Sequence, residues 1–199
     1  MSLRERRSPT NPWQGHARRT ASGWRPMGQG IRPSVALRPW LMVKTSLTRK
    51  LEEAHGCIRV EVLQQRVGQP FSDEAHPSGP PCVIRDVLLK NTAGQILVLA
   101  HSILPVAPRG ALHPMLKRLG RQALGSLLFT RPGFERCQRE WAQIDVRHPL
   151  YRAAQAQTDQ PLPKKLWARR ACFSPLRSSG SRESSAQTVQ VTEVFLPLP

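Results

Sequence analysis

The chain has 199 residues, of which 30 are Lys or Arg and 13 are Asp or Glu, so its formal net charge is +17. This length suits one domain with its own core. No stretch approaches the ~18 consecutive apolar residues of a membrane-spanning helix, so we expect no transmembrane segment. The cysteines form no CxxC pair and we find no hydrophobic signal segment, which excludes a zinc ribbon and a secreted disulfide scaffold. We therefore expect a cytoplasmic protein with reduced cysteines.

The positive charge is concentrated in a few segments. Residues 1–40 hold eight Arg and one Glu, for a net charge of +7, whereas residues 41–108 hold seven basic and six acidic residues, for +1. Residues 109–152 and 164–182 each add +6. A charge of +17 ordinarily points to nucleic acid or an anionic membrane surface. Because so much of it lies in one terminal segment, it does not by itself define the partner of the domain.

We predict that residues 1–38 form a disordered basic leader and that residues 39–199 form the domain. The leader lacks a sustained period, its prolines interrupt helices, and its apolar content cannot offset the entropy of ordering. Two other interpretations stay open. Translation starts downstream, for instance at Met27 or Met42, or the Arg- and Ser-rich, acid-poor composition is that of a transit peptide.

The first predicted elements follow the leader. Residues 41–54 are expected to form a helix, with Thr45 or Ser46 as its N-cap. Residues 57–66 alternate apolar and polar side chains and predict a half-buried strand. The next segment, residues 68–81, is a loop by composition.

A hairpin and a helical segment come next. Residues 82–89 and 95–104 predict two strands, and the sequence KNTAG between them predicts a tight turn. Residues 111–129 have apolar side chains at helical spacing, although Gly120 and Gly125 break or bend the helix.

Two further strands are predicted near the C-terminus, at residues 166–173 and 188–197, with a Ser-rich loop over residues 174–187 between them. Strands therefore outnumber helices, and their connections are those of hairpins rather than βαβ units. The expected fold is a single α+β domain built on an antiparallel sheet.

Motifs for metals and nucleophiles are absent from the sequence. The histidines share no ligand spacing such as HxxxH, and there is no GxSxG, Walker A or strand-linked GxGxxG motif. We therefore predict no metal and no cofactor.

Two ionisable residues share a strand face with apolar neighbours. Arg85 alternates with aliphatic residues in the strand at 82–89, and Glu193 does so in the strand at 188–197. Burying either charge bare is costly, so each needs a partner. An inward Arg suits an anionic ligand that it grips with two hydrogen bonds. The alternative is that Arg85 and Glu193 pair with each other in the core.

Six stretches resemble the chorismate pyruvate-lyase family, whose members release pyruvate from chorismate to leave 4-hydroxybenzoate. They are TSLTRKLE (45–52), VIRDVLL (83–89), ILPV (103–106), LGRQALGSLLFT (119–130), LWARR (166–170) and VTEVFLP (191–197). The stretches come in the family's order and span about residues 40–199. Each is weak alone, but six in order form a specific signal.

The resemblance implies a six-stranded antiparallel sheet with covering helices and a closed internal ligand pocket. Arg85 matches the family Arg that binds the ligand carboxylate, and Glu193 matches the Glu that hydrogen-bonds the ring hydroxyl. Leu124 matches a Leu that lines the pocket. Leu47 stands where the family has a Met in the site, a departure that keeps an apolar lining. His101 stands where the family commonly has an Arg. If that Arg neutralises a substrate carboxylate, His101 must do so as imidazolium, which would make affinity pH-dependent near neutrality.

The predicted function is that of a lyase that eliminates pyruvate from chorismate, the first committed step toward ubiquinone. The expected partners are chorismate and 4-hydroxybenzoate, with no specific nucleic acid, and we expect a monomer. The reaction aromatises the ring, so the site needs to orient substrate and stabilise charge rather than supply a cofactor. Two alternatives stay open: a non-catalytic domain of the same fold that senses a 4-hydroxybenzoate-type ligand, and nucleic-acid or membrane-surface binding through the leader.

Overall fold

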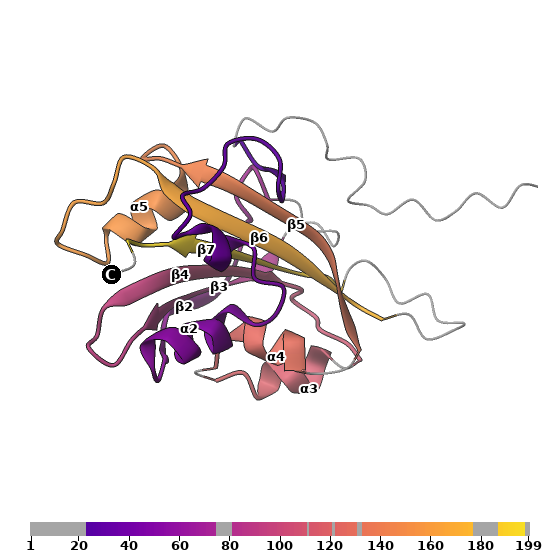
Figure 1. Cartoon of the computed structure of the whole chain (residues 1–199). Helices are drawn as coiled ribbons and strands as arrows, with labels where there is room; N and C mark the ends of the chain where they lie inside the picture. Colours follow the sequence, from indigo (N-terminus) through magenta and orange to yellow (C-terminus); the bar gives the residue numbers. More distant parts are fainter. Residues whose placement is uncertain are drawn as a thin grey trace, which may run out of the picture.

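The computed structural model describes residues 23–74, 81–110, 112–120, 122–130, 133–176 and 187–197, which form one domain around a long, strongly curved antiparallel sheet (Figure 1). The sheet has seven strands in the order β1-β5-β6-β7-β4-β3-β2. They are β1 (Arg25–Pro26), β2 (Arg59–Gly68), β3 (Cys82–Lys90), β4 (Ile96–Leu104), β5 (Phe134–Ile144), β6 (Leu166–Pro175) and β7 (Val189–Phe195). The helices are α1 (Arg38–Leu41), α2 (Leu47–His55), α3 (Leu112–Lys117), α4 (Leu124–Thr130) and α5 (Pro149–Gln155).

The predicted α+β domain on an antiparallel sheet is confirmed, but the predicted number of six strands was wrong. The sheet has seven strands because Arg25 and Pro26 pair with Trp141 and Glu140 at the outer edge of β5.

Within residues 23–38, which the sequence assigned to the disordered leader, Trp24, Met27 and Leu37 pack against the hydrophobic core, although most of the segment is exposed. Trp24 is only 7% exposed, and its indole Nε1 donates a hydrogen bond to Asp73 Oδ2 at 2.6 Å. The guanidinium carbon of Arg170 lies 4.3 Å from the centre of the Trp24 ring. The ordered domain therefore begins before residue 39, because one large aromatic side chain supplies the burial that the surrounding composition lacks. For residues 1–22, which lie outside the described residues, the leader stays a prediction.

Local signals in the sequence set the ends of α2. Ser46 caps it, as one of the two predicted alternatives had it, because its Oγ accepts a hydrogen bond from the backbone N–H of Arg49 at 3.3 Å. The helix ends at Gly56, whose φ of +75° suits a residue without a side chain. The predicted helix over 41–54 therefore begins too early, and α1 is a separate short helix. The predicted helix over 111–129 is two helices, α3 and α4, with a break at Gly120, where φ is +44°.

Like β1 and α1, the elements β5 and α5 were not expected from the sequence. In β5 a β-bulge between Arg136 and Gln138 interrupts the alternation that would have indicated a strand. The short helix α5 begins with Pro149, and the side chain of His148 caps it by accepting a hydrogen bond from the backbone N–H of Leu150.

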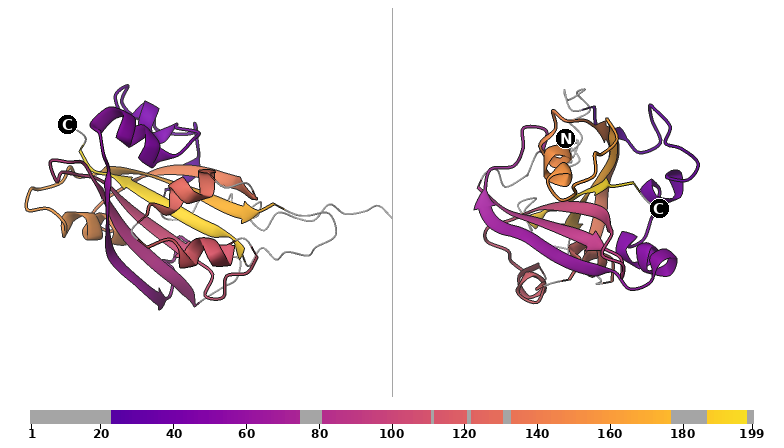
Figure 2. Two further views of the ribbon diagram at one scale, coloured as in Figure 1. Left: turned by 90° about the horizontal axis from the view of Figure 1, so that it is seen from below. Right: turned by 90° about the vertical axis from the view of Figure 1, so that its left-hand side faces the viewer.

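Helices cover both faces of the sheet. α2, α3 and α4 cover one face, which we call the α2–α4 face, and they lie below the strands in Figure 1 and partly in front of them in the left view of Figure 2. α5 covers the opposite face, here the α5 face, together with Trp24. None of the helices that the structure describes is long and apolar enough to cross a membrane.

Candidate active site

Arg85 and Glu193 lie on the same face of the sheet, the α2–α4 face. Arg85 of β3 is opposite Ser102 of β4, which in turn is opposite Val191 of β7. Glu193 lies two residues beyond Val191 on β7, and its partner on β4 is Ala100. The two charged residues are thus two strands and two residues apart, a Cα separation of about 12 Å from ordinary strand spacings. Small side chains occupy the sheet between them.

Arg85 is a buried cation bound to backbone oxygens. The side chain is 1% exposed, and its Nη2 donates hydrogen bonds to the backbone oxygens of Gly120 and Gln122, at 3.0 and 3.1 Å. These oxygens belong to the connection between α3 and α4. Its Nε is buried without a hydrogen-bond partner in the part of the chain that the structure describes. Burial lowers the pKa of the guanidinium, but an Arg stays protonated at neutral pH.

Glu193 is paired with an arginine that the sequence did not single out. Arg169 of β6 lies directly opposite Glu193, and its Nε donates to Glu193 Oε2 at 2.5 Å. The Nη1 of Arg169 donates to three backbone oxygens of the segment 40–43, at 3.1 to 3.3 Å. The alternative in which Arg85 and Glu193 neutralise each other is therefore wrong: the carboxylate has a different cation.

Leu47 and Leu124 are both buried above this area. Leu47, in the first turn of α2, belongs to the hydrophobic cluster that includes Val87 and Ala100 of the sheet. Leu124 begins α4 and belongs to the cluster that includes Val191. A hydrogen bond of 3.1 Å between the hydroxyls of Ser46 and Ser126 ties the two helices together. The helices therefore form a joint roof over the face that carries Arg85 and Glu193.

A small pocket, partly open to solvent, lies on this face over β5, β6 and β7. Of the predicted site residues, Glu193 lines it, whereas Arg85, Leu47 and Leu124 do not. The side chains and backbone that line it belong to Met27, Gly125, Phe129, Arg136, Arg139, Arg169, Arg170, Ala171, Phe173, Val191 and Glu193. The pocket thus extends from Glu193 away from Arg85.

Two of the pocket arginines, Arg136 and Arg139, lie on the same face because of the bulge in β5. Arg136 is opposite Phe173 and Arg139 is opposite Ala171, and both partners share the α2–α4 face with Arg169. In a regular strand, residues three apart point to opposite faces. Sequence reasoning missed both because it did not recognise the strand. Arg169 could have been identified from the sequence, because it alternates with apolar residues in the predicted strand 166–173, as Arg85 does in the strand 82–89.

Arg136 and Arg139 are bound to backbone oxygens, whereas Arg169 is bound to the Glu193 carboxylate. Arg136 Nη2 donates to Lys44 O at 2.8 Å, and Arg139 Nη2 donates to the oxygens of Met42 and Val43 at 3.1 and 3.2 Å. Within the described part of the chain, neither forms an ion pair. Burial, together with the nearby charges of Arg139 and Arg169, lowers the pKa of Arg136 to about 10, so it remains a cation at neutral pH. With one carboxylate facing three arginines, the pocket attracts anions.

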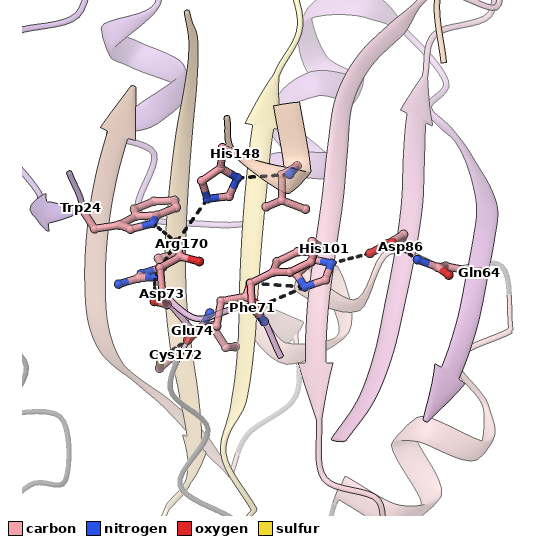
Figure 3. A network of polar contacts seen from close by, with 12 residues as sticks. Trp24, Gln64, Phe71, Asp73, Glu74, Asp86, His101, His148, Arg170 and Cys172 are labelled. Carbon is pink, nitrogen blue, oxygen red and sulfur yellow. Dashed lines mark hydrogen bonds and ion pairs between the residues drawn. The ribbon is translucent and has the colours of Figure 1, made fainter. Parts of the chain in front are cut away.

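His101 lies on the other side of the sheet, on the α5 face (Figure 3). Its ring is 1% exposed and lies between two carboxylates: Nδ1 is 2.5 Å from Asp86 Oδ1, and Nε2 is 3.2 Å from Glu74 Oε1. Phe71 stacks on the ring at 5.0 Å between centroids. Burial disfavours the charged form, but the hydrogen bonds and charges of Asp86 and Glu74 raise the pKa of His101 to about 9. His101 is therefore protonated and paired with two carboxylates on the α5 face. It does not replace the family's Arg at a substrate carboxylate on the α2–α4 face.

Asp73 lies between Phe71 and Glu74 in the chain and attaches this segment to other elements of the α5 face. Its carboxylate accepts hydrogen bonds from Trp24 and His148, and its backbone oxygen accepts one from Arg170 Nη1 at 2.7 Å (Figure 3). Although burial raises it, these hydrogen bonds and the charges of His148 and Arg170 bring the pKa of Asp73 below its ordinary value. The α5 face is therefore closed by structural ion pairs.

A helix-covered antiparallel sheet with a buried arginine and an arginine-lined pocket is suited to a small organic anion. Comparison with known proteins shows the family. Residues 19–199 match the family model described as chorismate lyase. A probable chorismate pyruvate-lyase of Dechloromonas aromatica is 38% identical over 179 residues, which cover 88% of this chain and 95% of the relative. The enzyme of the same name from Thiobacillus denitrificans is 35% identical over 180 residues, 88% of this chain and 89% of the relative. The chain belongs to the chorismate lyase family.

Among solved structures, a possible transcriptional regulator of Bacillus subtilis is similar with a TM-score of 0.40 and 8% identity, over 70% of this chain and 57% of that one. A similarity this low bears on neither fold nor function.

Proposed function

We propose that the protein is a lyase that eliminates pyruvate from chorismate and leaves 4-hydroxybenzoate, the first committed step toward ubiquinone. Relatives of 38% and 35% identity that carry the name chorismate pyruvate-lyase support this reaction. The observation that carries the proposal is the placement of Arg85 and Glu193 on one helix-covered face, about 12 Å apart between Cα atoms.

Each predicted residue has a role in this scheme. The ring carboxylate of chorismate binds Arg85, whose buried Nε has no hydrogen-bond partner among the described residues. The Nη2 exchanges its two neutral backbone oxygens for a charged carboxylate oxygen. The carboxylate of Glu193 accepts a hydrogen bond from the ring hydroxyl, held in place by Arg169. Leu47 and Leu124 close the apolar sides of the ring.

The chemistry asks little more of the protein than positioning and charge. The C3–O bond breaks, the hydrogen on C4 leaves as a proton, and the third double bond of the aromatic ring forms between C3 and C4. The enolpyruvate that leaves gains a proton on its methylene carbon and becomes pyruvate, so the two products together have the composition of chorismate. Because aromatisation supplies the driving force, the site acts by holding the reactive conformer, excluding water and stabilising developing charge.

The test is to incubate the purified protein with chorismate and a metal chelator and to follow 4-hydroxybenzoate by chromatography. We expect turnover without any added cofactor, and we expect Arg85→Ala to abolish it while circular dichroism reports a folded protein. Arg85→Lys keeps the charge but not the two-pronged grip and should retain little activity. The matched control is Arg49→Ala, which removes a positive charge from the exposed side of α2.

Unchanged activity in Arg85→Ala would refute the assigned anchor. If the wild-type protein binds 4-hydroxybenzoate but does not convert chorismate, the ligand-sensing alternative is correct instead. The monomeric state and cytoplasmic location stay predictions.

A further inference from the structure

We propose that Arg136 and Arg139 form the binding site for the enolpyruvyl carboxylate of chorismate and stabilise the enolate as it leaves. This inference rests on the proposed function and deepens it, since it assigns the second negative charge of the substrate to residues in a part of the sheet that sequence reasoning did not recognise.

The first argument is the register of the sheet. One row of directly opposed residues crosses five strands on the α2–α4 face, in the order Arg139, Ala171, Val191, Ser102 and Arg85. The middle of that row lies on β7, and Glu193 is two residues further along the same strand. Arg85 and Arg139 are therefore each two strands away from Glu193, on opposite sides of it. The hydroxyl acceptor is central, with a cation at either end.

The second argument is the substitution pattern of chorismate. Its ring carboxylate is on C1, its hydroxyl is on C4, directly across the ring, and its enolpyruvyl ether is on C3, next to the hydroxyl. When the C1 carboxylate binds Arg85 and the hydroxyl faces Glu193, the group on C3 must lie close to Glu193 and away from Arg85. That is the position of the pocket over β5 and β6, which Arg136 and Arg139 line.

The third argument is the state of the charges. The charge of Arg169 is matched by Glu193 at 2.5 Å. Arg136 and Arg139 form no such pair among the described residues, and they donate only to backbone oxygens of the segment 42–44. Burial, together with the nearby cations, lowers the pKa of both, so a carboxylate between them relieves repulsion as well as forming charge-assisted hydrogen bonds.

The same charges act on the leaving group. When the C3–O bond breaks, both bonding electrons go to the oxygen, so the departing enolate carries a second negative charge beside its carboxylate. Preorganised cations beside an oxygen that gains charge lower the barrier. Arg136 and Arg139 are therefore expected to affect kcat as well as KM.

The experiment compares two ligands that differ in this one group. 4-Hydroxybenzoate has the C1 carboxylate and the hydroxyl but no enolpyruvyl group. For Arg139→Gln we expect kcat/KM for chorismate to fall by about 10–100-fold, the value of one charged hydrogen bond, while the Kd of 4-hydroxybenzoate changes less than about twofold. Arg136→Gln should behave likewise. Arg139→Lys should recover part of the loss, and Arg49→Gln, on the exposed side of α2, serves as the charge-matched control.

An equal weakening of both ligands in Arg139→Gln would mean that the residue only supports the fold, and unchanged chorismate kinetics would mean that the carboxylate binds elsewhere. Either result overturns the proposal. If Arg139→Gln does not fold, Arg136→Gln gives the same comparison, because among the described residues the Arg136 side chain makes one hydrogen bond to the backbone where that of Arg139 makes two. Failure of the wild-type protein to convert chorismate counts against the proposed function instead, and is seen before any variant is made.

Discussion

Arg169 and Glu193 lie directly opposite each other on β6 and β7, and the guanidinium that binds the carboxylate also binds three backbone oxygens of the segment 40–43. The Arg169 side chain thus holds both the carboxylate of Glu193, the proposed acceptor for the ring hydroxyl, and the segment 40–43. The acceptor and the roof of the pocket are therefore coupled.

Replacing Arg169 with Gln should destabilise the domain by about 3–5 kcal/mol, because it leaves a buried carboxylate without its cation. Urea unfolding measures the loss. The double variant Arg169→Gln with Glu193→Gln should recover part of the stability, since no unpaired charge remains. A single variant as stable as the wild type would show that the carboxylate is reached by water.

Replacing Glu193 with Gln should lower kcat/KM for chorismate by about 10–100-fold, because a neutral acceptor replaces a charged one at the ring hydroxyl. Steady-state kinetics and the Kd of 4-hydroxybenzoate measure the effect, and both should worsen. Glu53→Gln, at an exposed position of α2, is the control for loss of a negative charge. Kinetics within twofold of the wild type would remove Glu193 from the site.

The ion pair of His101 makes stability depend on pH on the alkaline side. The pKa of His101 is about 9 in the folded protein and about 6.5 in an unfolded chain. Its contribution is fully present below pH ~6.5 and is lost as the pH rises to ~9, a change of about 3 kcal/mol. Asp86 acts on the acid side: despite burial its pKa is lowered by His101, Gln64 and Arg66, so its contribution is lost below pH ~4. Urea unfolding from pH 5 to 9 should show a decline above pH ~6.5.

A variant separates His101 from other titrating groups. His101→Arg restores a cation that does not titrate in this range, so its stability should stay flat between pH 6.5 and 9, whereas His101→Gln should be less stable at every pH because Asp86 and Glu74 lose their partner. Chorismate kinetics should be unaffected by the Arg variant, since the residue is on the face opposite the proposed site. A decline in His101→Arg equal to that of the wild type would assign the pH dependence elsewhere.

Truncated chains should show whether the folded domain begins near residue 23 or at residue 39. A chain that begins at residue 23 should keep both stability and chorismate turnover. A chain that begins at residue 39 lacks Trp24 and β1 and should lose about 3–5 kcal/mol, the usual cost of removing a buried Trp side chain. Trp24→Ala in the full chain provides the matched measurement. Salt-sensitive RNA binding that disappears with residues 1–22 would assign an accessory role to that segment.

The strands with regular alternation could be predicted from the sequence, and so could the faces of Arg85 and Glu193, because period 2 is a property of the strand itself. The N-cap at Ser46 followed from side-chain chemistry in the same way. What the sequence could not show was β5: a bulge beside Arg136 shifts the period within the strand, so charged residues three apart come to the same face.

Partner choice was equally beyond reach. The alternation of residues indicated that Glu193 needs a cation, and Arg85 was the candidate that the sequence offered. The observed partner is Arg169, because β6 lies next to β7 in the sheet. The same limit applies to His101, whose partner Glu74 comes from a predicted loop. Strand order and loop placement are tertiary properties, so pairing between distant segments has to be observed.

The backbone oxygens of the segment 42–44 accept hydrogen bonds from Arg136 and Arg139. The segment above the pocket therefore competes with the ligand for these two arginines. Since the oxygens are attached to the same molecule, they compete at a fixed effective concentration and cannot be diluted away. A weakly held inorganic anion should seldom displace them, whereas a substrate anchored at a second point can. Once the C3–O bond has broken, the pyruvate has lost that second anchor, and the returning oxygens favour its departure.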